Sequence, residues 1–340
     1  MYIEEIGERG LIRRIQRKFS TYNRSITIGI GDDSAIIKTS AGKSLLFSTD
    51  TLREGIHFLR KYYTFYDIGW KAVAVSVSDI AAMGGAPKYL LLSMALPSRT
   101  CIEDIDKLLN GVADITKRFG ISLIGGNLAR SKGGVSIDTT MVGELPHGRA
   151  LLRSGASAGD LIYVSGVPGK SAIGLSILKS ASHDRLKPFY SKSFIVHHLR
   201  PIPRVKEGFI LGKNRLATAA IDISDGLLSD LARICEQSDV GASIYSNLLP
   251  LPEVQRMIKK RLAKGPEFYA LYGGEDYELL FTVKRKNRAR LEAICKDEGL
   301  AITFIGEVMP AENGITLIGK DNVQRILKTE GYDHFRVLRS

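Results

Sequence analysis

The sequence has few cysteines, one tryptophan and no long apolar run. Cys101, Cys235 and Cys295 are widely separated and form no C-x-x-C pair, so neither a disulfide framework nor a zinc site is expected. The longest apolar stretches, such as YLLLSMAL at 89–96, are far shorter than a membrane-spanning helix. The N-terminus, MYIEEIGERG, lacks the basic and apolar regions of an export signal. These absences predict a cytoplasmic protein with no membrane segment.

Composition predicts a folded protein of two domains. The chain has 340 residues, of which 44% are hydrophobic and 25% charged, values that are ordinary for globular proteins. The net charge of +12 raises the question of nucleic-acid binding, and KRKNRAR at 284–290 is the densest basic cluster. The other basic residues are scattered and lack interleaved aromatics for base stacking. The charge therefore favours anionic small molecules over nucleic acid.

Hydrophobic periodicity predicts an α+β protein with two mixed α/β domains. Amphipathic spacing indicates helices over 8–20, 67–83 and 102–119, among strands near 27–37, 43–50, 89–96, 121–126 and 135–145. The pattern restarts after 148–158, which divides the chain into domains 1–150 and 151–340. In the second domain the same reading predicts strands at 161–166, 218–224, 241–246, 277–283, 302–308 and 315–319, and helices from Gly169 and over 226–237, 252–263 and 287–298.

Two glycine-rich stretches fail as nucleotide motifs. In VSGVPGKSAIG at 164–174, a P-loop would need glycine at position 164, which is Val164. This stretch is expected to form a plain strand-to-helix turn, although the start of the helix still favours an anion. Gly29 and Gly31 are not followed by the third glycine of a dinucleotide fingerprint.

Aspartates recur where apolar runs end. Asp32 and Asp33 are adjacent in TIGIGDDSAI, and in isolation such a pair would be interpreted as a solvated turn or a helix cap. Similar endings occur at 45–50, 74–79 and 219–226, so we expect the carboxylates to converge at strand ends. Clustered carboxylates repel one another unless divalent ions neutralise them, and hard oxygen ligands suit Mg²⁺. Clustered Mg²⁺ in turn binds polyphosphate, which favours an ATP-dependent phosphoryl-transfer enzyme. The predicted ligands are Asp33, Asp50, Asp79, Asp222 and Asp225, with Ser48 and Thr49 as supporting oxygens.

A resemblance extends over nearly the whole chain. The matching stretches, in order, are GIGDDSA, STDTLREGIHF, WKAVAVSVSDIAAMGGAPK, GGNLARS, LLRSGASAGD, DISDGLLSDL, YGGEDYELLFT and GYDHF. On these motifs the chain resembles the thiamine-monophosphate kinase family, of the superfamily shared with aminoimidazole ribonucleotide synthetase and selenophosphate synthetase.

The resemblance implies two α+β domains, a homodimer paired through the N-terminal domains, and ATP held with several Mg²⁺ ions. The implied metal ligands are Asp33, Ser48, Thr49, Asp50, Asp79, Asn127, Asp222 and Asp225. The implied ATP contacts are Gly126, Asn127, Arg153 and Ser224. The implied thiamine-phosphate contacts are His57, Glu275 and Tyr332. The implied catalytic residues are Asp50, Asp79, Arg153 and Asp222.

Six of these residues also have a purely structural interpretation. His57 could be a core histidine, Glu275 a cap, Tyr332 a packing residue and Arg153 a surface charge at the domain boundary. Asp222 and Asp225 could cap the helix that follows them, which would not exclude metal binding.

Two positions depart from the family pattern. Asn127 stands where many members have aspartate, which removes a charge but keeps a carbonyl ligand. Leu109 stands where some members place an aromatic residue near adenine.

The implied reaction is ATP-dependent phosphorylation of thiamine monophosphate to thiamine diphosphate. A phosphate monoester is largely a dianion at neutral pH, because its second pKa is about 6, so direct in-line transfer needs little help from a base. One alternative is another ATP-using enzyme of the superfamily with a different acceptor, although no reactive cysteine near the N-terminus supports selenide chemistry. Another alternative is a non-catalytic protein that binds nucleotides or nucleic acid.

Overall fold

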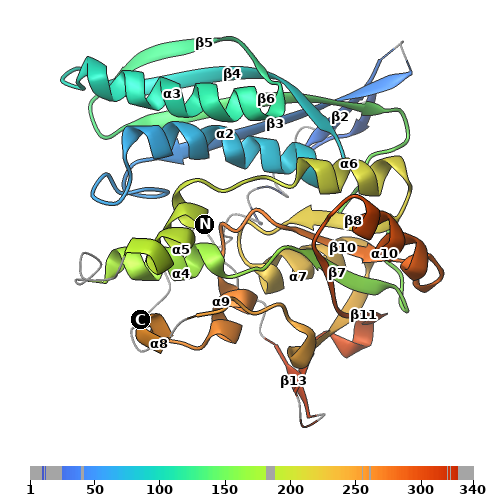
Figure 1. Ribbon diagram of the computed structural model, residues 1–340. Helices are drawn as coiled ribbons and strands as arrows, with labels where there is room; N and C mark the ends of the chain where they lie inside the picture. The colour runs from blue at the N-terminus through green and yellow to red at the C-terminus, as the bar shows by residue number, and fades with distance from the viewer. Residues whose placement is uncertain are drawn as a thin grey trace.

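Two β-sheets with associated helices form two α+β domains, as predicted (Figure 1). The computed structural model describes residues 10, 12, 25–39, 42–180, 188–254, 256–259, 262–319, 321 and 323–327. The first sheet ends at Pro146 and the second begins at Leu161. The helix expected over 8–20 lies almost entirely outside the described residues, and Tyr332 lies outside them.

The N-terminal sheet has six strands in the order β1-β2-β3-β6-β4-β5. All neighbours are antiparallel except β4 and β5, which are parallel. Alternate side chains of β3 and β6 are buried, so one face of the sheet is covered and the other is more open. The strands are β1 (Ile26–Ile28), β2 (Ala35–Lys38), β3 (Lys43–Arg53), β4 (Ala86–Pro97), β5 (Ser122–Ser131) and β6 (Ser136–Pro146).

Two long helices cover the inner face of this sheet, α2 (Phe65–Ala82) and α3 (Ile102–Phe119). Helix α2 begins at a capping box in which Thr64 and Asp67 satisfy each other's backbone N–H groups. The two helices approach closely because Gly69 and Gly111 face the backbone of the partner helix. A Cβ added at Gly69 would lie 2.0 Å from the carbonyl oxygen of Leu108.

The C-terminal sheet has seven strands in the order β13-β12-β9-β11-β7-β10-β8. Strand β7 is buried along its whole length, with Ile162 and Val164 in one apolar cluster and Leu161 and Tyr163 in another. The sheet is therefore packed on both faces. The strands are β7 (Leu161–Ser165), β8 (Ala217–Asp222), β9 (Val240–Tyr245), β10 (Leu279–Val283), β11 (Ile302–Pro310), β12 (Ile315–Ile318) and β13 (Gln324–Ile326).

In the second domain α7 packs on this sheet, α4, α5, α8 and α9 lie to one side of it, and α6 reaches the first domain (Figure 1). Helix α6 packs on α2, where a Cβ added at Gly208 would lie 1.9 Å from the carbonyl oxygen of Ala81. The helices are α4 (Lys170–Lys179), α5 (Pro188–Leu199), α6 (Val205–Lys213), α7 (Leu227–Ser238), α8 (Arg256–Lys259), α9 (Pro266–Tyr272) and α10 (Arg288–Asp297), with 3₁₀ turns Ser246–Leu248, Arg285–Asn287 and Ala311–Asn313.

Several predictions needed correction. Helices α5, α6 and α9 were not expected, and of the helix expected over 252–263 only α8 is present among the described residues. The described helices include none that is both long and apolar enough to cross a membrane.

The start of α4 is capped by a carboxyl side chain from another segment of the same chain. Asp276 accepts the backbone N–H groups of Gly169, at 2.5 Å, and Ser171, at 2.9 Å. The side chain thus occupies the position where the sequence pattern suggested an external anion.

Candidate active site between the domains

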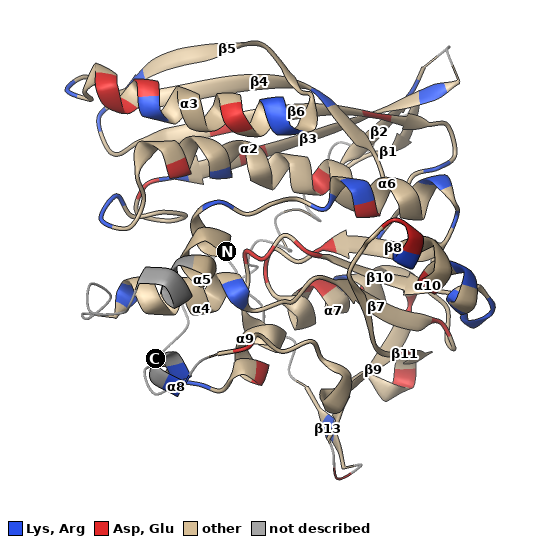
Figure 2. Cartoon of the chain, viewed as in Figure 1, with Lys and Arg blue, Asp and Glu red and all other residues tan. Residues whose placement is uncertain are grey.

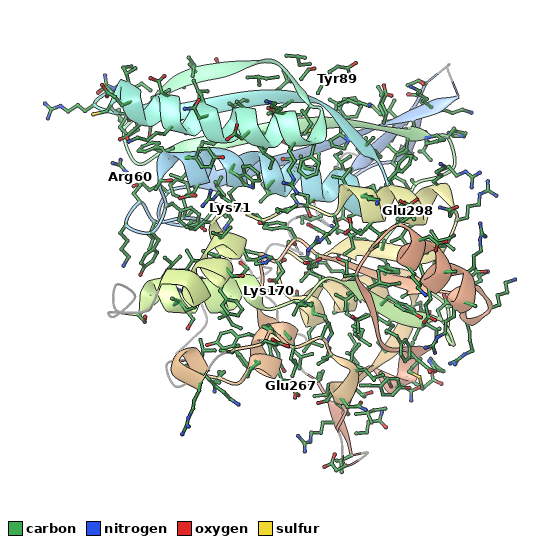
Figure 3. All side chains as sticks on the ribbon, in the orientation of Figure 1. Arg60, Lys71, Tyr89, Lys170, Glu267 and Glu298 are labelled. Carbon is green, nitrogen blue, oxygen red and sulfur yellow. The ribbon has the colours of Figure 1, made fainter. Side chains whose placement is uncertain are left out.

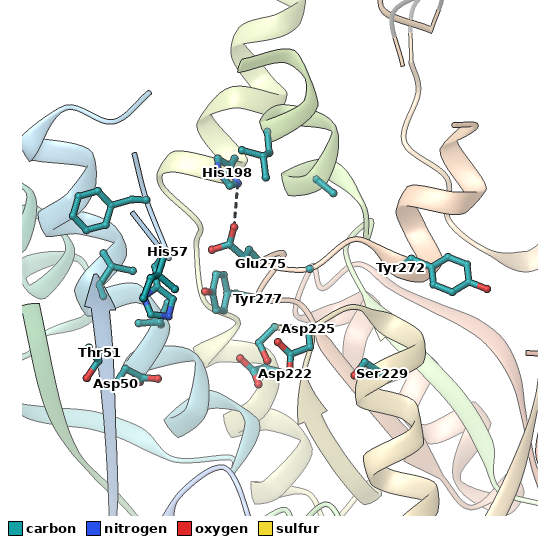
Figure 4. A pocket seen from close by; sticks show the side chains of 18 of the residues that line it. Asp50, Thr51, His57, His198, Asp222, Asp225, Ser229, Tyr272, Glu275 and Tyr277 are labelled. Atoms are coloured by element: carbon teal, nitrogen blue, oxygen red, sulfur yellow. Dashed lines mark ion pairs between the residues drawn. The ribbon is translucent and has the colours of Figure 1, made fainter. Parts of the chain in front are cut away.

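A cavity of about 820 Å³ lies between the two domains (Figure 4). Asp50 and His57 line it from the N-terminal domain, and Asp222, Asp225 and Glu275 line it from the C-terminal domain. Neither domain alone would provide this site.

Three carboxylates from separate parts of the chain meet at the edge of the cavity. Oxygen atoms of Asp33, Asp79 and Asp222 all lie within 4.8 Å of one another. The expectation that the aspartates sit at strand ends is confirmed for Asp222 and wrong for two others. Asp50 lies inside β3, which continues to Arg53, and Asp79 belongs to α2. These residues converge because α2 crosses the inner face of β3 and reaches the end of β8.

Serine hydroxyls hold the carboxylates in place. Ser76 of α2 donates to Asp50 at 2.7 Å, and Ser78 of the same helix donates to Asp222 at 2.6 Å. Ser48 of β3 donates to Asp79. Each hydrogen bond fixes one carboxylate oxygen of its aspartate.

The cluster is electrostatically costly without cations. Burial, and then the neighbouring Asp33, raise the pKa of Asp222 to about 7. Burial, followed by Asp50, Asp222 and Asp33, raises the pKa of Asp79 well above its usual value. Oδ2 of Asp33 is buried and has no hydrogen-bond partner among the described residues. An all-oxygen donor set with an unsatisfied buried oxygen fits Mg²⁺.

Asp32 and Asp33 have different partners. Oδ1 of Asp32 accepts the backbone N–H of Asp33 at 2.9 Å, and Oδ2 accepts that of Arg153 at 3.3 Å. The side chain of Asp33 points to the carboxylate cluster and accepts from the Arg153 guanidinium. Asp32 thus supports the loop, whereas Asp33 faces the site.

Arg233 lines the cavity beside Asp225, whereas Arg153 is not among the lining residues. Arg233 of α7 donates to Asp225 and, at 3.0 Å, to Asp230. Asp230 also accepts the backbone N–H groups of Ser224 and Asp225. Sequence reasoning missed Arg233 and Asp230.

The structure does not bring every predicted ligand to the cluster. The side chain of Thr49 faces the opposite side of β3 from Ser48 and Asp50, and donates to the carbonyl of Thr139. Asn127 lies on the exposed strand β5. Two strands, β6 and β4, lie between β5 and β3, so β5 and β3 are about 14 Å apart at the usual strand spacing. A ligand role for either residue stays a prediction.

Gly126 allows β5 to approach β4. Its φ is +157°, and an added Cβ would lie 1.7 Å from the carbonyl oxygen of Leu92. Gly126 is not among the residues that line the cavity, and its contact with ATP stays a prediction.

Three other predicted contacts lie on the cavity wall. His57 follows β3 and accepts the backbone N–H of Arg53 at 3.0 Å through Nδ1. Ser224 follows β8, and its carbonyl accepts the backbone N–H of Glu275 at 2.7 Å. The assignments of these residues to ATP and to the acceptor stay predictions.

Sequence reasoning missed a buried polar group beside Glu275, formed by Lys71, Tyr63 and His198. Lys71 lies 2.6 Å from Glu275, and Tyr63 and His198 also line the cavity. A signal was present in WKAVAVSVSD, where a lysine and two serines interrupt an otherwise apolar helix. The partners could not be read from it, because they come from distant segments.

Comparison with known proteins places this architecture in a two-domain class. Residues 31–145 match the AIR synthase related protein N-terminal domain, and residues 157–318 match its C-terminal domain. Escherichia coli HypE, a hydrogenase maturation protein, is 19% identical with a TM-score of 0.70, which shows a shared fold.

Individual relatives define the family. Thiamine-monophosphate kinase of Buchnera aphidicola from Acyrthosiphon pisum is 43% identical over 309 residues, covering 90% of this chain and 92% of the relative. Thiamine-monophosphate kinase of Escherichia coli K12 is 39% identical, covering 97% of this chain and 98% of the relative. The structure of AaThiL complexed with AMPPCP and TMP has a TM-score of 0.85 at 34% identity, covering 98% of this chain and 99% of that chain. The chain belongs to the thiamine-monophosphate kinase family, whose members are phosphotransferases.

Proposed function

We propose that this protein transfers the γ-phosphoryl group of ATP to thiamine monophosphate, giving thiamine diphosphate and ADP, the last step of thiamine diphosphate biosynthesis. The observation that carries the proposal is the carboxylate cluster at the edge of an interdomain cavity, in a chain of this family. The relative complexed with AMPPCP and TMP supports the two substrates.

Mg²⁺ and ATP occupy the cluster end of the cavity in this proposal. Asp33, Asp50, Asp79, Asp222 and Asp225 would hold several Mg²⁺ ions, which neutralise phosphate charge and align the reacting groups when bound. Arg153 and Ser224 would contact the nucleotide. Arg153 is held beside Asp33, where a guanidinium suits phosphate oxygens.

The acceptor occupies the end of the cavity near His57 and Glu275. Its phosphate is largely dianionic at neutral pH, so the protein's task is positioning and charge neutralisation rather than proton removal. Direct in-line transfer follows, without a phosphoenzyme. Tyr332, outside the described residues, is assigned to the same acceptor by the family resemblance.

We assign residues 1–150 to ATP and Mg²⁺ binding and to pairing in a homodimer, and residues 151–340 to completing the site. Pairing is supported by apolar side chains on the outer face and edge of the first sheet, seen at Tyr89 in Figure 3. Leu128 is 72% and Ile124 58% exposed, and β5 carries almost no charge (Figure 2). Asn127 would lie in that contact. The cytoplasm is the proposed location.

The decisive test is chromatographic detection of thiamine diphosphate after incubation with ATP, Mg²⁺ and thiamine monophosphate. Asp50→Asn is expected to remove at least 99% of the product, and the exposed Asp297→Asn is the matched control. Folded protein that binds ATP without making thiamine diphosphate would indicate a different acceptor within the superfamily. A phosphorylated protein trapped during turnover would contradict direct transfer.

A further inference from the structure

A fully buried lysine joins the two domains beside the acceptor end of the cavity. The Lys71 side chain is 0% exposed, and its Nζ lies 2.6 Å from Oε1 of Glu275. It also donates to the Tyr63 hydroxyl at 2.8 Å. Figure 3 shows Lys71 on α2 between the two domains. Glu275 comes from the segment between α9 and β10, so this ion pair fixes one domain to the other.

His198 of α5 completes the group. Its Nε2 lies 2.8 Å from the Tyr63 hydroxyl, and its Nδ1 lies 3.0 Å from Oγ of Ser171. The same Nδ1 lies 3.5 Å from Oε2 of Glu275, the contact marked by the dashed line in Figure 4. Burial, and then the Lys71 charge, lowers the pKa of His198 to about 3, so the ring is neutral at physiological pH.

One arrangement of protons gives every member of the group a partner. Lys71 donates to Tyr63, Tyr63 donates to Nε2 of His198, and the Nδ1–H group faces Ser171 and Glu275. The positive charge stays on Lys71 and the negative charge on Glu275. Glu275 therefore meets a single buried cation and a neutral imidazole.

The backbone of Glu275 is strained in a way that points to a ligand. Its φ is +64°, in the left-handed region that glutamate rarely adopts, and Tyr277 follows at +53°. Backbone hydrogen bonds to Ser224 and Ile223 hold this segment in place. Such conformations cost about 1–3 kcal/mol each and cluster at binding sites. The result is a carboxylate that is 31% exposed and lies on the cavity wall.

A buried lysine is a poor stabiliser of a fold. Replacing a buried ion pair by apolar groups of similar size is often neutral or stabilising, because both charges lose their hydration. Lys71 also lies in an otherwise apolar part of α2, where a methionine would fill the same space. Stability alone therefore does not account for the lysine.

We propose that Lys71 and His198 are positioning residues that hold Glu275 as an oriented anion, with Oε1 turned to Lys71 and Oε2 presented to an N–H donor on the heterocyclic end of the acceptor. This inference rests on the proposed function and extends it, because it assigns recognition of the acceptor ring to a group built from both domains.

The test is steady-state kinetics of Lys71→Met with thiamine monophosphate as the varied substrate. KM for thiamine monophosphate is expected to rise at least tenfold, with kcat within threefold of wild type and KM for ATP unchanged. Lys206→Met is the control, because Lys206 is exposed and pairs with Glu298 away from the cavity. An equal rise in KM for thiamine monophosphate and for ATP, or an unchanged KM for thiamine monophosphate, would overturn the inference.

A pH profile separates positioning from a merely structural role. Glu275 faces Lys71, Tyr63, His198 and His57; without the Lys71 charge its carboxylate protonates more readily. The KM of Lys71→Met relative to that of wild type should therefore rise from pH 8 to pH 6, because titration of the acceptor phosphate affects both proteins equally. Glu275→Gln should have a raised KM without the pH dependence, and adding Lys71→Met to it should cause little further loss. A pH-independent defect in Lys71→Met would contradict the proposal.

Calorimetric binding of thiamine monophosphate distinguishes this inference from the proposed function. If wild type binds thiamine monophosphate but forms no product, the proposed reaction fails and weaker binding by Lys71→Met still supports the positioning role. If wild type turns over and Lys71→Met binds equally well, the positioning role alone is wrong. Absence of binding to wild type would overturn both. Should Lys71→Met fail to fold, His198→Gln is expected to weaken binding at least threefold, and unchanged binding would contradict the proposal.

Discussion

Ser78 on α2 donates a hydrogen bond of 2.6 Å to Asp222 at the end of β8, so a single hydroxyl from one domain satisfies a buried carboxylate of the other. Ser78→Ala should lower the free energy of unfolding by about 1–3 kcal/mol, because the carboxylate loses its donor. Urea denaturation measures this change, with the exposed Ser98→Ala as the control. A loss no larger than in the control would show that this hydrogen bond contributes little.

Mg²⁺ should stabilise the protein through the carboxylate cluster. At a Mg²⁺ concentration one hundred times the dissociation constant, binding to the folded state adds about 2.7 kcal/mol per site. Asp79→Asn relieves repulsion in the buried cluster, so without Mg²⁺ this variant should be at least as stable as wild type. Thermal unfolding with and without Mg²⁺ tests both expectations. Equal Mg²⁺-induced shifts in Tm for wild type and Asp79→Asn would remove Asp79 from the metal site, and Asp297→Asn should behave as wild type.

His198 should make the protein acid-sensitive. Its folded pKa of about 3 lies below the ordinary value of 6.5, so between these values the unfolded state binds a proton that the folded state does not. The stability contributed by the neutral ring is present above pH 6.5 and is lost as the pH falls. By pH 5 the loss is on the order of 2 kcal/mol. Urea titrations at several pH values should show a shallower decline for His198→Gln, and parallel curves would contradict the assignment.

The contact between α2 and α3 should tolerate no side chain at Gly69. An added methyl group would lie 2.0 Å from the carbonyl oxygen of Leu108, so the two helices would have to separate. Gly69→Ala should cost about 1–3 kcal/mol despite the better helix propensity of alanine. Calorimetric Tm measures the effect. Gly120→Ala is the comparison. Its added methyl group would meet open space, but the φ of +65° is a conformation that alanine rarely adopts. The two variants together therefore separate the cost of crowding from the cost of backbone strain.

The helices on the first sheet were predictable because their signals are local. Helix α3 has the predicted bounds of 102–119, and α2 begins and ends within two residues of its predicted bounds. The order of the strands β3-β6-β4-β5 was not predictable, since pairing depends on contacts between distant segments.

The candidate site was predictable in its chemistry but not in its construction. Recurrent aspartates correctly indicated a carboxylate cluster, whereas the strand-end rule failed for Asp50 and Asp79, because it is the crossing of a helix over a sheet that brings them in. Periodicity carried no indication that Lys71 would meet Glu275. Only the assembled domain interface contains that information.

Helix α2 carries both Lys71 and Asp79, which are eight residues apart in one rigid element, or about 12 Å along the helix axis. In the proposed binding mode, with the acceptor ring at Glu275 and its phosphate at the carboxylate cluster, this helix fixes the distance between the two ends of the acceptor. An acceptor must match that length to use both ends at once, so a molecule with the right ring and a shorter arm would bind without delivering its phosphate to the metals. The length of acceptor that this protein accepts would then be set by helix α2, not by a loop.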